Sequence, residues 1–306
     1  MRLVQHKEEA WWFYRFLSNF YDKLVNPLFW TARMRDECLV LAKLDHPDLR
    51  VIDVGSGTGF NTEGIVRHVP ASQVTCVDQS PHQLARAKKK SVLQHCTFLL
   101  GDAENIPAET DSFDRYTSTG SIEYWPNPQQ GLMEAYRVIK PGGIALMVGP
   151  IEPKGPIARF LANTWMLFPK EEEYFQWMKG AGFVDIQHVY TAPHWIPGRE
   201  KYGIGISGRK PVSGVSPGWQ PITAVAQAGE KKNMSFGRKV QLFFRVIIGS
   251  LAGFFFIPGA LIGYLFAIGK QSHIPKEQRE KLNGYQIAVL VILGLLLIFL
   301  IYKIVS

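Results

Sequence analysis

The sequence predicts an α/β domain built on a parallel sheet with helices on both faces, followed by an apolar tail. Short apolar runs alternate with helical segments from Arg50 onward, and a glycine-rich turn directly follows the first run. The last stretch of the 306-residue chain is far more apolar than the rest. We expect four parts: an aromatic helical segment (1–49), the α/β domain (50–210), a linker (211–240) and the tail (241–306).

Charge and cysteine content exclude some classes of function. Residues 1–210 hold 24 Lys/Arg against 23 Asp/Glu, a balance of +1, while the remaining residues hold 10 against 3, a balance of +7. The basic excess therefore lies in the tail, which removes the main electrostatic support for a nucleic-acid partner. Cys38, Cys76 and Cys96 form no disulfide framework and show no metal-ligand spacing. We expect no metal, and no protein partner is indicated.

The first elements follow from apolar spacing and turn residues. Trp11 to Leu24 is rich in aromatic side chains at helical spacing, so we interpret it as a helix packed on the core. The alternative interpretation of this stretch is an apolar lid over a substrate, or a membrane contact. A buried apolar run at 51–54 predicts a strand, and Pro81 at a first helical turn predicts a helix start.

The same alternation continues to about Lys210. The turn at 140–143 separates a helix from the next strand, and a Gly-Ala-Gly sequence at 180–182 ends another helix. The expected strands are 51–54, 73–77, 97–100, 115–118, 144–148, 184–190 and 202–207, and the expected helices are 58–68, 81–90, 129–138 and 170–179. Strands that alternate with helices predict a parallel sheet.

The tail contains two uncharged apolar runs, at about 246–268 and 283–302. At about 1.5 Å per residue, each run reaches the ~30 Å of a bilayer core. The sequence therefore predicts a transmembrane helical hairpin, with small residues such as Gly249 and Gly253 suited to close helix packing. The N-terminus shows no signal-peptide pattern.

The glycine-rich turn is the strongest chemical signal. Gly55, Gly57 and Gly59 follow a buried strand, and such residues let the backbone turn sharply and approach a ligand. Their G-x-G-x-G spacing differs from the dinucleotide G-x-G-x-x-G pattern, and no P-loop lysine follows. Asp53 sits at the end of the strand, and an acid beside this turn suits a ligand with an ammonium or sulfonium group. The combination indicates S-adenosylmethionine.

Two further strand ends agree with this ligand. Asp78, followed by Gln79, ends the second strand, where a carboxylate can bind both hydroxyls of a ribose. Asp102 and Ala103 follow the third strand, near the expected position of an adenine amino group. Each aspartate alone is equally consistent with a helix cap or a turn. Together they predict a cofactor site made of Asp53, Gly55, Gly57, Gly59, Asp78, Gln79, Asp102 and Ala103.

With these residues in view, the sequence resembles class I methyltransferases, and within them the plant 2-methyl-6-phytyl-1,4-benzoquinol methyltransferase family. Four segments carry the resemblance: Gln5–Leu17, Asp78–Ala85, Gly120–Pro126 and Trp165–Tyr174. The resemblance implies a Rossmann-like sheet and transfer of a methyl group from S-adenosylmethionine to a ring carbon of a prenylated benzoquinol. It also implies an integral membrane protein of the plastid inner envelope; otherwise we expect a cytoplasmic membrane, with the catalytic domain on the cytosolic side.

The reaction needs a base to make the ring electron-rich, and an apolar site for the ring. Glu123 follows the fourth expected strand and ranks first as the base, with His6 and His194 as alternatives. The expected substrate-binding aromatic residues are Tyr124, Trp125, Trp165 and Phe168, each of which could instead be a core residue. Two other functions stay open: methylation of another membrane lipid, and a non-catalytic scaffold that binds S-adenosylmethionine.

Overall fold

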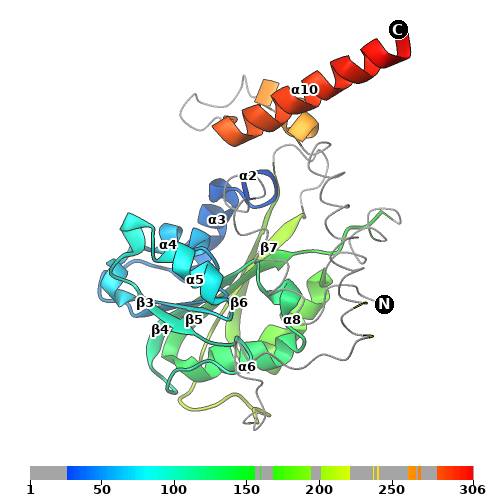
Figure 1. Cartoon of the computed structure of the whole chain (residues 1–306). Helices are drawn as coiled ribbons and strands as arrows, with labels where there is room; N and C mark the ends of the chain where they lie inside the picture. The colour runs from blue at the N-terminus through cyan, green and yellow to red at the C-terminus, as the bar shows by residue number, and fades with distance from the viewer. Residues whose placement is uncertain are drawn as a thin grey trace.

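The computed structural model of the chain describes residues 26–155, 159, 168–193, 201–220, 237, 240, 261–266, 268–269 and 281–305. Its centre is a seven-stranded sheet with the strand order β3-β2-β1-β4-β5-β7-β6 (Figure 1). The strands are β1 Val51–Val54, β2 Val74–Asp78, β3 Thr97–Leu100, β4 Phe113–Thr119, β5 Ile139–Pro150, β6 Val184–Thr191 and β7 Gly203–Arg209. All seven strands that the sequence predicts are therefore confirmed.

One strand runs against the others. β1 to β5 pair in parallel, whereas β7 is antiparallel to both β5 and β6. The predicted parallel sheet is confirmed for β1 to β5, and β7 is the strand that departs from it. A parallel neighbour requires a crossover connection, but an antiparallel neighbour can follow without one. Helix α8 (Glu171–Gly180) provides the crossover from β5 to β6, and β7 then returns between them.

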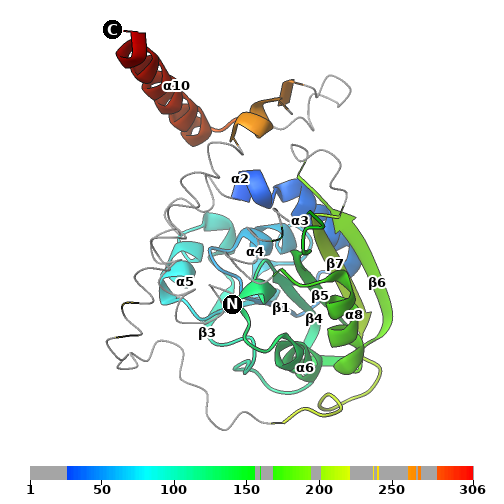
Figure 2. The same cartoon turned by 90° about the vertical axis from the view of Figure 1, so that its right-hand side faces the viewer.

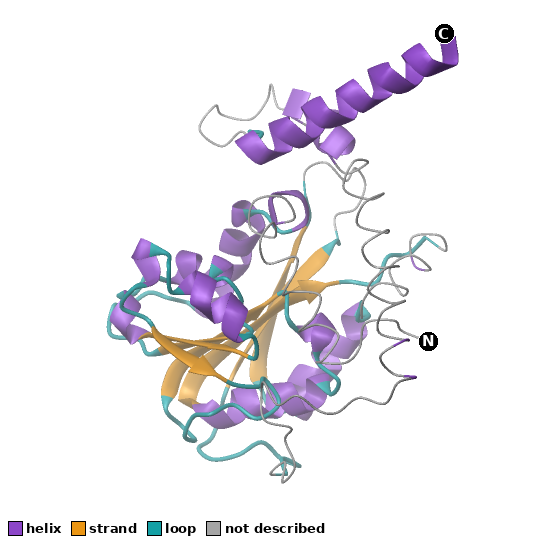
Figure 3. Cartoon of the chain, in the orientation of Figure 1, coloured by secondary structure: helices purple, strands orange, loops and turns teal. Residues whose placement is uncertain are grey.

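Helices cover both faces of the sheet, as Figures 2 and 3 show. One face packs against α3 (Ala32–Leu39), α4 (Phe60–Ile65) and α5 (Pro81–Ala87), through a core that includes Met34 and Ile65. The other face packs against α6 (Pro128–Val138) and α8, through a core that includes Tyr136 and Tyr174. The other named helical elements are α2 Asn26–Phe29, η2 Val40–Ala42, η3 Ala71–Gln73, η4 Ser91–Leu93, η5 Ile122–Tyr124 and α10 Gly284–Val305, and residues 261–266 are also helical.

The first part of the predicted linker packs on the domain. The indole N–H of Trp219 donates to Glu134 Oε1 at 2.6 Å, and the backbone N–H of Gly214 donates to Asp111 Oδ2 at 3.0 Å. The buried ammonium of Lys210 donates to Asp111 and to the carbonyl of Gly214. Hydrogen bonds therefore fix this segment to Glu134 of α6 and to Asp111, which lies just before β4.

The predicted transmembrane hairpin is not confirmed. Among the residues whose side chains the structure describes, no helix is long and apolar enough to cross a bilayer. The first predicted run, 246–268, lies mostly outside the described residues, and the second coincides with α10. Leu261 and Tyr264 pack on Leu28 of α2, with Val289 and Leu290 of α10 beside them.

Candidate active site

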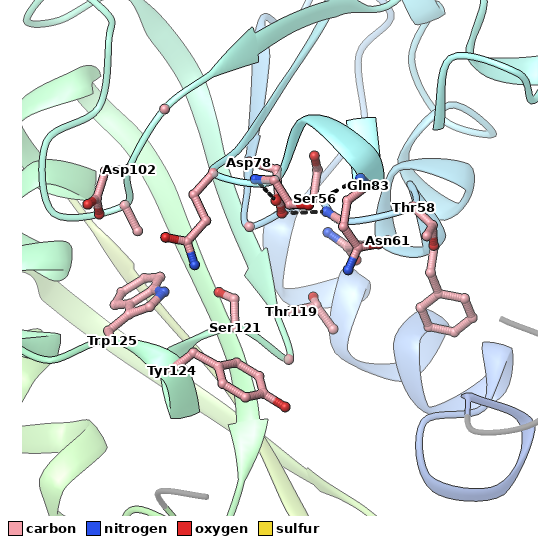
Figure 4. A pocket seen from close by; sticks show the side chains of 18 of the residues that line it. Ser56, Thr58, Asn61, Asp78, Gln83, Asp102, Thr119, Ser121, Tyr124 and Trp125 are labelled. Carbon is pink, nitrogen blue, oxygen red and sulfur yellow. Dashed lines mark hydrogen bonds between the residues drawn. The ribbon is translucent and has the colours of Figure 1, made fainter. Parts of the chain in front are cut away.

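A cavity opens where the carboxyl ends of β1, β2, β3 and β4 meet (Figure 4). Ligands of open α/β sheets bind at this edge because the loops that leave parallel strands converge there. The lining residues are Trp30, Gly55, Ser56, Gly57, Thr58, Phe60, Asn61, Asp78, Gln79, Ser80, Gln83, Gly101, Asp102, Ala103, Thr119, Gly120, Ser121, Tyr124 and Trp125.

The glycines of the turn have different structural roles. Gly57 and Gly59 have φ angles of +56° and +86°, a region that favours glycine. A Cβ on Gly59 would lie 2.4 Å from Leu93 Cδ1, so this position is set by packing beneath the turn. A Cβ on Gly57 would meet nothing nearer than Gln83 Oε1, at 3.8 Å. Gly57 therefore leaves free space at the cavity wall, while Gly59 does not line the cavity.

Asp78 is fixed by the glycine turn and by Ser80, the residue that caps α5. Its Oδ2 accepts from the backbone N–H of Gly57 at 2.8 Å, and its Oδ1 accepts from the N–H of Ser80 at 2.8 Å. Removal of the carboxyl from water raises the pKa of Asp78 to about 6, although these two hydrogen bonds lower it. Each oxygen keeps acceptor capacity, so the pair can bind two adjacent hydroxyls.

Asp53 lies behind the turn and does not line the cavity. Its oxygens accept from Asn61 Nδ2 at 2.7 Å, from Thr62 Oγ1 at 2.6 Å and from Thr117 Oγ1 at 3.0 Å. Burial raises the pKa of Asp53, and these three hydrogen bonds oppose that rise. The carboxyl thus joins the start of α4 to β1 and β4, and it holds Asn61 at the cavity wall.

The far end of the cavity is formed by two linked segments. Asp102 Oδ1 accepts from the backbone N–H of Glu104 at 2.9 Å, and Glu104 Oε1 accepts from the N–H of Asn127 at 2.7 Å. These bonds bring the segment of Trp125 against the turn of Asp102, and Figure 4 shows both on the side of the cavity opposite Thr58. Trp125 packs so closely on α6 that a Cβ on Gly131 would lie 2.4 Å from its ring.

Comparisons with known proteins agree with this geometry. A family model described as "Methyltransferase domain" matches residues 52–147. The chain is 48% identical over 284 residues to the chloroplastic 2-methyl-6-phytyl-1,4-hydroquinone methyltransferase of Arabidopsis thaliana, covering 90% of this chain and 80% of the relative. A rice relative of the same name (Oryza sativa subsp. japonica) is 45% identical, covering 90% of this chain and 82% of its own length.

This chain belongs to that methyltransferase family. It is a class I methyltransferase, and S-adenosylmethionine is its methyl donor. A solved structure of a SAM-dependent methyltransferase from Thermotoga maritima, titled a possible histamine N-methyltransferase, has the same fold. It superimposes with a TM-score of 0.51 at 23% identity, covering 65% of this chain and 99% of that one.

The cavity of the methyltransferase fits this donor. Ser56 Oγ and Gln83 Oε1 are buried without a hydrogen-bond partner among the described residues. The lining residues include two aspartates, Asp78 and Asp102, and no lysine or arginine. Unpaired polar atoms and negative charge suit a ligand with hydroxyl and amino groups and a positive charge, and do not suit a phosphate.

Glu123 of the methyltransferase lies just behind the cavity wall. Its side chain is 4% exposed and does not line the cavity, and its Oε2 has no hydrogen-bond partner among the described residues. Burial raises the pKa of Glu123 to about 8. A carboxyl with this pKa changes protonation near neutral pH, which is a property of general bases and acids.

The predicted site residues divide into three groups. The structure brings together eight of them at the cavity: Gly55, Gly57, Asp78, Gln79, Asp102, Ala103, Tyr124 and Trp125. Four others are described but do not line it: Asp53, Gly59, Glu123 and Phe168. The last three lie outside the described residues, so their roles stay predictions: His6, Trp165 and His194.

Several lining residues were missed by the sequence analysis. Phe60 and Asn61 directly follow the third glycine of the turn, and this position in the sequence could have indicated that they line the cavity. Thr119 ends β4, and Gly120 and Ser121 follow it, at the same sheet edge as the predicted residues. Trp30 comes from the loop after α2, and no sequence pattern connects it to the cavity.

Proposed function

We propose that this methyltransferase transfers a methyl group from S-adenosylmethionine to a ring carbon of a prenylated benzoquinol. The observation that carries the proposal is the 48% identity over 284 residues to a 2-methyl-6-phytyl-1,4-hydroquinone methyltransferase. That relative acts on a phytyl hydroquinone by name, and the aligned length includes far more than the cofactor-binding part.

The methyl donor occupies the polar part of the cavity in this proposal. Asp78 binds the two ribose hydroxyls, because the N–H groups of Gly57 and Ser80 fix the orientation of its carboxylate. Asp102 and Ala103 contact the adenine, and the ring of Trp125 packs against it. When bound, S-adenosylmethionine supplies a methyl group that is already activated by a positively charged sulfur.

The aromatic side chains of the remaining wall receive the ring of the quinol. Tyr124, Trp30 and Phe60 line the cavity, so this part of the site excludes water and suits an apolar ring. Holding the ring carbon in line with the methyl group supplies much of the rate. In the balanced reaction, the new C–C bond uses a ring electron pair, the C–S pair stays on sulfur, and the ring C–H proton leaves to solvent.

The proposed location is the plastid. The Arabidopsis and rice relatives are named as chloroplastic proteins, and they cover most of this chain. A prenylated quinol dissolves in lipid, so we propose that the enzyme meets its substrate at a plastid membrane. Catalysis itself requires that the quinol ring reach the cavity, and detergent-dispersed substrate therefore suffices for a test.

The test is an assay of the full chain with methyl-labelled S-adenosylmethionine and three substrate classes: a prenylated benzoquinol, a sterol and a phospholipid amine. Mass spectrometry should find the label on a ring carbon of the quinol. An Asp78→Ala variant should lose this product, whereas a variant at the exposed Asp48 should keep it. Label in the sterol or the phospholipid alone would show that this lipid, and not the quinol, is the substrate. Label in no product would favour a non-catalytic scaffold.

A further inference from the structure

An open space lies beside Gly120, at the end of β4. Gly120 lines the cavity and has a φ angle of +64°. A Cβ built on Gly120 would lie 3.8 Å from Glu123 Oε1 and 4.0 Å from Trp30 Nε1, and these are its nearest contacts outside its chain neighbours. The position of this missing Cβ is therefore a space that lies within 4.0 Å of both an acceptor and a donor.

The indole of Trp30 is fixed at this place. Its six-membered ring packs on the backbone of β7, because a Cβ on Gly203 would lie 2.8 Å from Trp30 Cη2. The ring of Tyr202 meets it edge-on, with centroids 6.0 Å apart. Trp30 is 8% exposed, so its Nε1 holds a constant position beside Gly120.

Two polar atoms of the residues around Gly120 lack partners. The second carboxyl oxygen of Glu123, Oε2, and Oγ1 of Thr119, which precedes Gly120 in the chain, are both buried without a hydrogen-bond partner among the described residues. A buried polar atom that makes no hydrogen bond costs about 1–3 kcal/mol, and such atoms in native proteins commonly serve a ligand. The Tyr174 hydroxyl next to Glu123 is not available to it, since it donates to the carbonyl of Pro150 at 3.0 Å.

We propose that the space between Trp30, Gly120 and Glu123 is a subsite for one hydroxyl of the substrate ring, in which Trp30 Nε1 donates to the hydroxyl oxygen and Glu123 accepts its proton. This inference rests on the proposed function for the identity of the ring. It adds the residues that select a free hydroxyl and fix which side of the ring faces the methyl donor.

The proton movement balances within the ring and Glu123. The carboxylate of Glu123 takes the hydroxyl proton, and the O–H electron pair stays on the oxygen, which makes the ring carbon more nucleophilic. After methylation, the ring C–H proton leaves to solvent while Glu123 returns its proton to the ring oxygen. Trp30 Nε1 stabilises the charge that develops on this oxygen.

The surroundings of Glu123 set the expected pH dependence. Burial raises the pKa of Glu123 to about 8, against a backbone hydrogen bond of Glu123 itself that lowers it. The charge of Glu123 acts on Tyr174 of α8. Burial raises the pKa of Tyr174 well above the ordinary value, so the Tyr174 hydroxyl stays neutral. The rate should therefore rise as the pH rises through about 8, because the basic form of Glu123 appears over that range.

The test compares Glu123→Gln, Trp30→Phe and Gly120→Ala in the full chain, with a prenylated hydroquinone and with its monomethyl ether as probes. We expect Glu123→Gln to lower kcat by about 100-fold and to remove the rise with pH. We expect Gly120→Ala and Trp30→Phe to weaken binding of the hydroquinone by about tenfold, measured by calorimetry with S-adenosylhomocysteine present. Affinity for S-adenosylmethionine should stay within about twofold in all three variants.

Matched variants separate the subsite from general damage. Gly142 has a φ of +79° and a Cβ there would meet nothing within 4 Å, so Gly142→Ala introduces the same backbone strain without filling a subsite. Trp177→Phe changes a half-buried indole on α8 away from the cavity. The inference is overturned if Gly120→Ala behaves like Gly142→Ala, or if Glu123→Gln keeps the pH profile of the unchanged chain.

Failure of the proposed function gives a different result. If the unchanged chain binds the hydroquinone but does not methylate it, the calorimetric comparison still tests the subsite. Weaker binding in Gly120→Ala and Trp30→Phe would then support the subsite while the reaction is rejected. Absence of any binding of the hydroquinone by the unchanged chain would overturn both proposals.

Discussion

The backbone N–H of Gly57 donates a hydrogen bond to Asp78 Oδ2 at 2.8 Å. This bond joins the glycine turn after β1 to the end of β2, so two parts of the cavity wall that come from different strands form one unit. Gly55 strengthens the connection, because its N–H donates to the carbonyl of Val77 at 2.8 Å. Preorganised donors and acceptors of this kind bind a ligand without a further cost of ordering.

The first prediction concerns the affinity for the methyl donor. Asp78→Ala should weaken binding of S-adenosylmethionine by about 1–3 kcal/mol, because the ribose hydroxyls lose their acceptor and the N–H of Gly57 loses its partner. Isothermal titration calorimetry measures the change. Asp48→Ala is the control, since the Asp48 side chain is 83% exposed and lies outside the cavity. Equal affinities for both variants would show that the ribose binds elsewhere.

The second prediction is a pH dependence of this affinity. The pKa of Asp78 is raised to about 6, and its ionised form is the acceptor that the hydroxyls need. The dissociation constant should therefore increase as the pH falls through 6, by up to about tenfold per pH unit. Asp78→Asn should remove this dependence. A dependence that persists in Asp78→Asn would assign the titration to another group.

Asp78 should affect the stability of the ligand-free chain in the opposite direction. Its pKa in the folded state is about 6, above the 3.8 of a solvated carboxyl, so folding favours the protonated form. The contribution of Asp78 to stability is therefore complete below pH 3.8 and is lost as the pH rises through 6. Denaturant unfolding of the ligand-free chain and of Asp78→Asn at several pH values measures the difference.

The third prediction separates the two glycines of the turn. Gly59→Ala should lower the free energy of unfolding by about 2 kcal/mol or more, because its Cβ would lie 2.4 Å from Leu93 Cδ1 at a positive φ. Gly57→Ala should lose less stability, since its Cβ has room, but it should weaken S-adenosylmethionine binding more. Leu93→Ala should partly rescue Gly59→Ala. A failure of this rescue would place the damage in the backbone conformation.

The fourth prediction concerns residues 211–220. Trp219→Phe removes the N–H that donates to the buried Glu134 at 2.6 Å and should cost about 1–3 kcal/mol of unfolding free energy. Binding of S-adenosylmethionine should not change, since Trp219 does not line the cavity. Thermal and denaturant unfolding of the full chain measure the cost, with Trp177→Phe as the control. If the free energy of unfolding is unchanged, the segment does not stabilise the domain and acts as a linker.

The sequence by itself determined the elements and the polar part of the site. The alternation of strand-like runs and helical segments predicted all seven strands, and the signal was clearest at β1, which is buried at every position and gives an uninterrupted run. It also placed Gly57, Asp78 and Asp102 in one cavity, since the carboxyl ends of parallel strands meet at one edge. These conclusions require only the residue pattern within each segment and the rule that the carboxyl ends of parallel strands lie at one edge of the sheet.

The tertiary structure alone decided the direction of β7, the inward turn of Asp53 toward Asn61, and the meeting of Trp30 with Gly120. Apolar spacing shows that a segment is buried, but it does not show which distant segment it packs against. The ring of Trp30 packs on Gly203 of β7, and the position that a Cβ on Gly120 would take lies 3.8 Å from Glu123 Oε1 and 4.0 Å from Trp30 Nε1. Contacts between side chains far apart in the chain are fixed by the packing of the whole sheet.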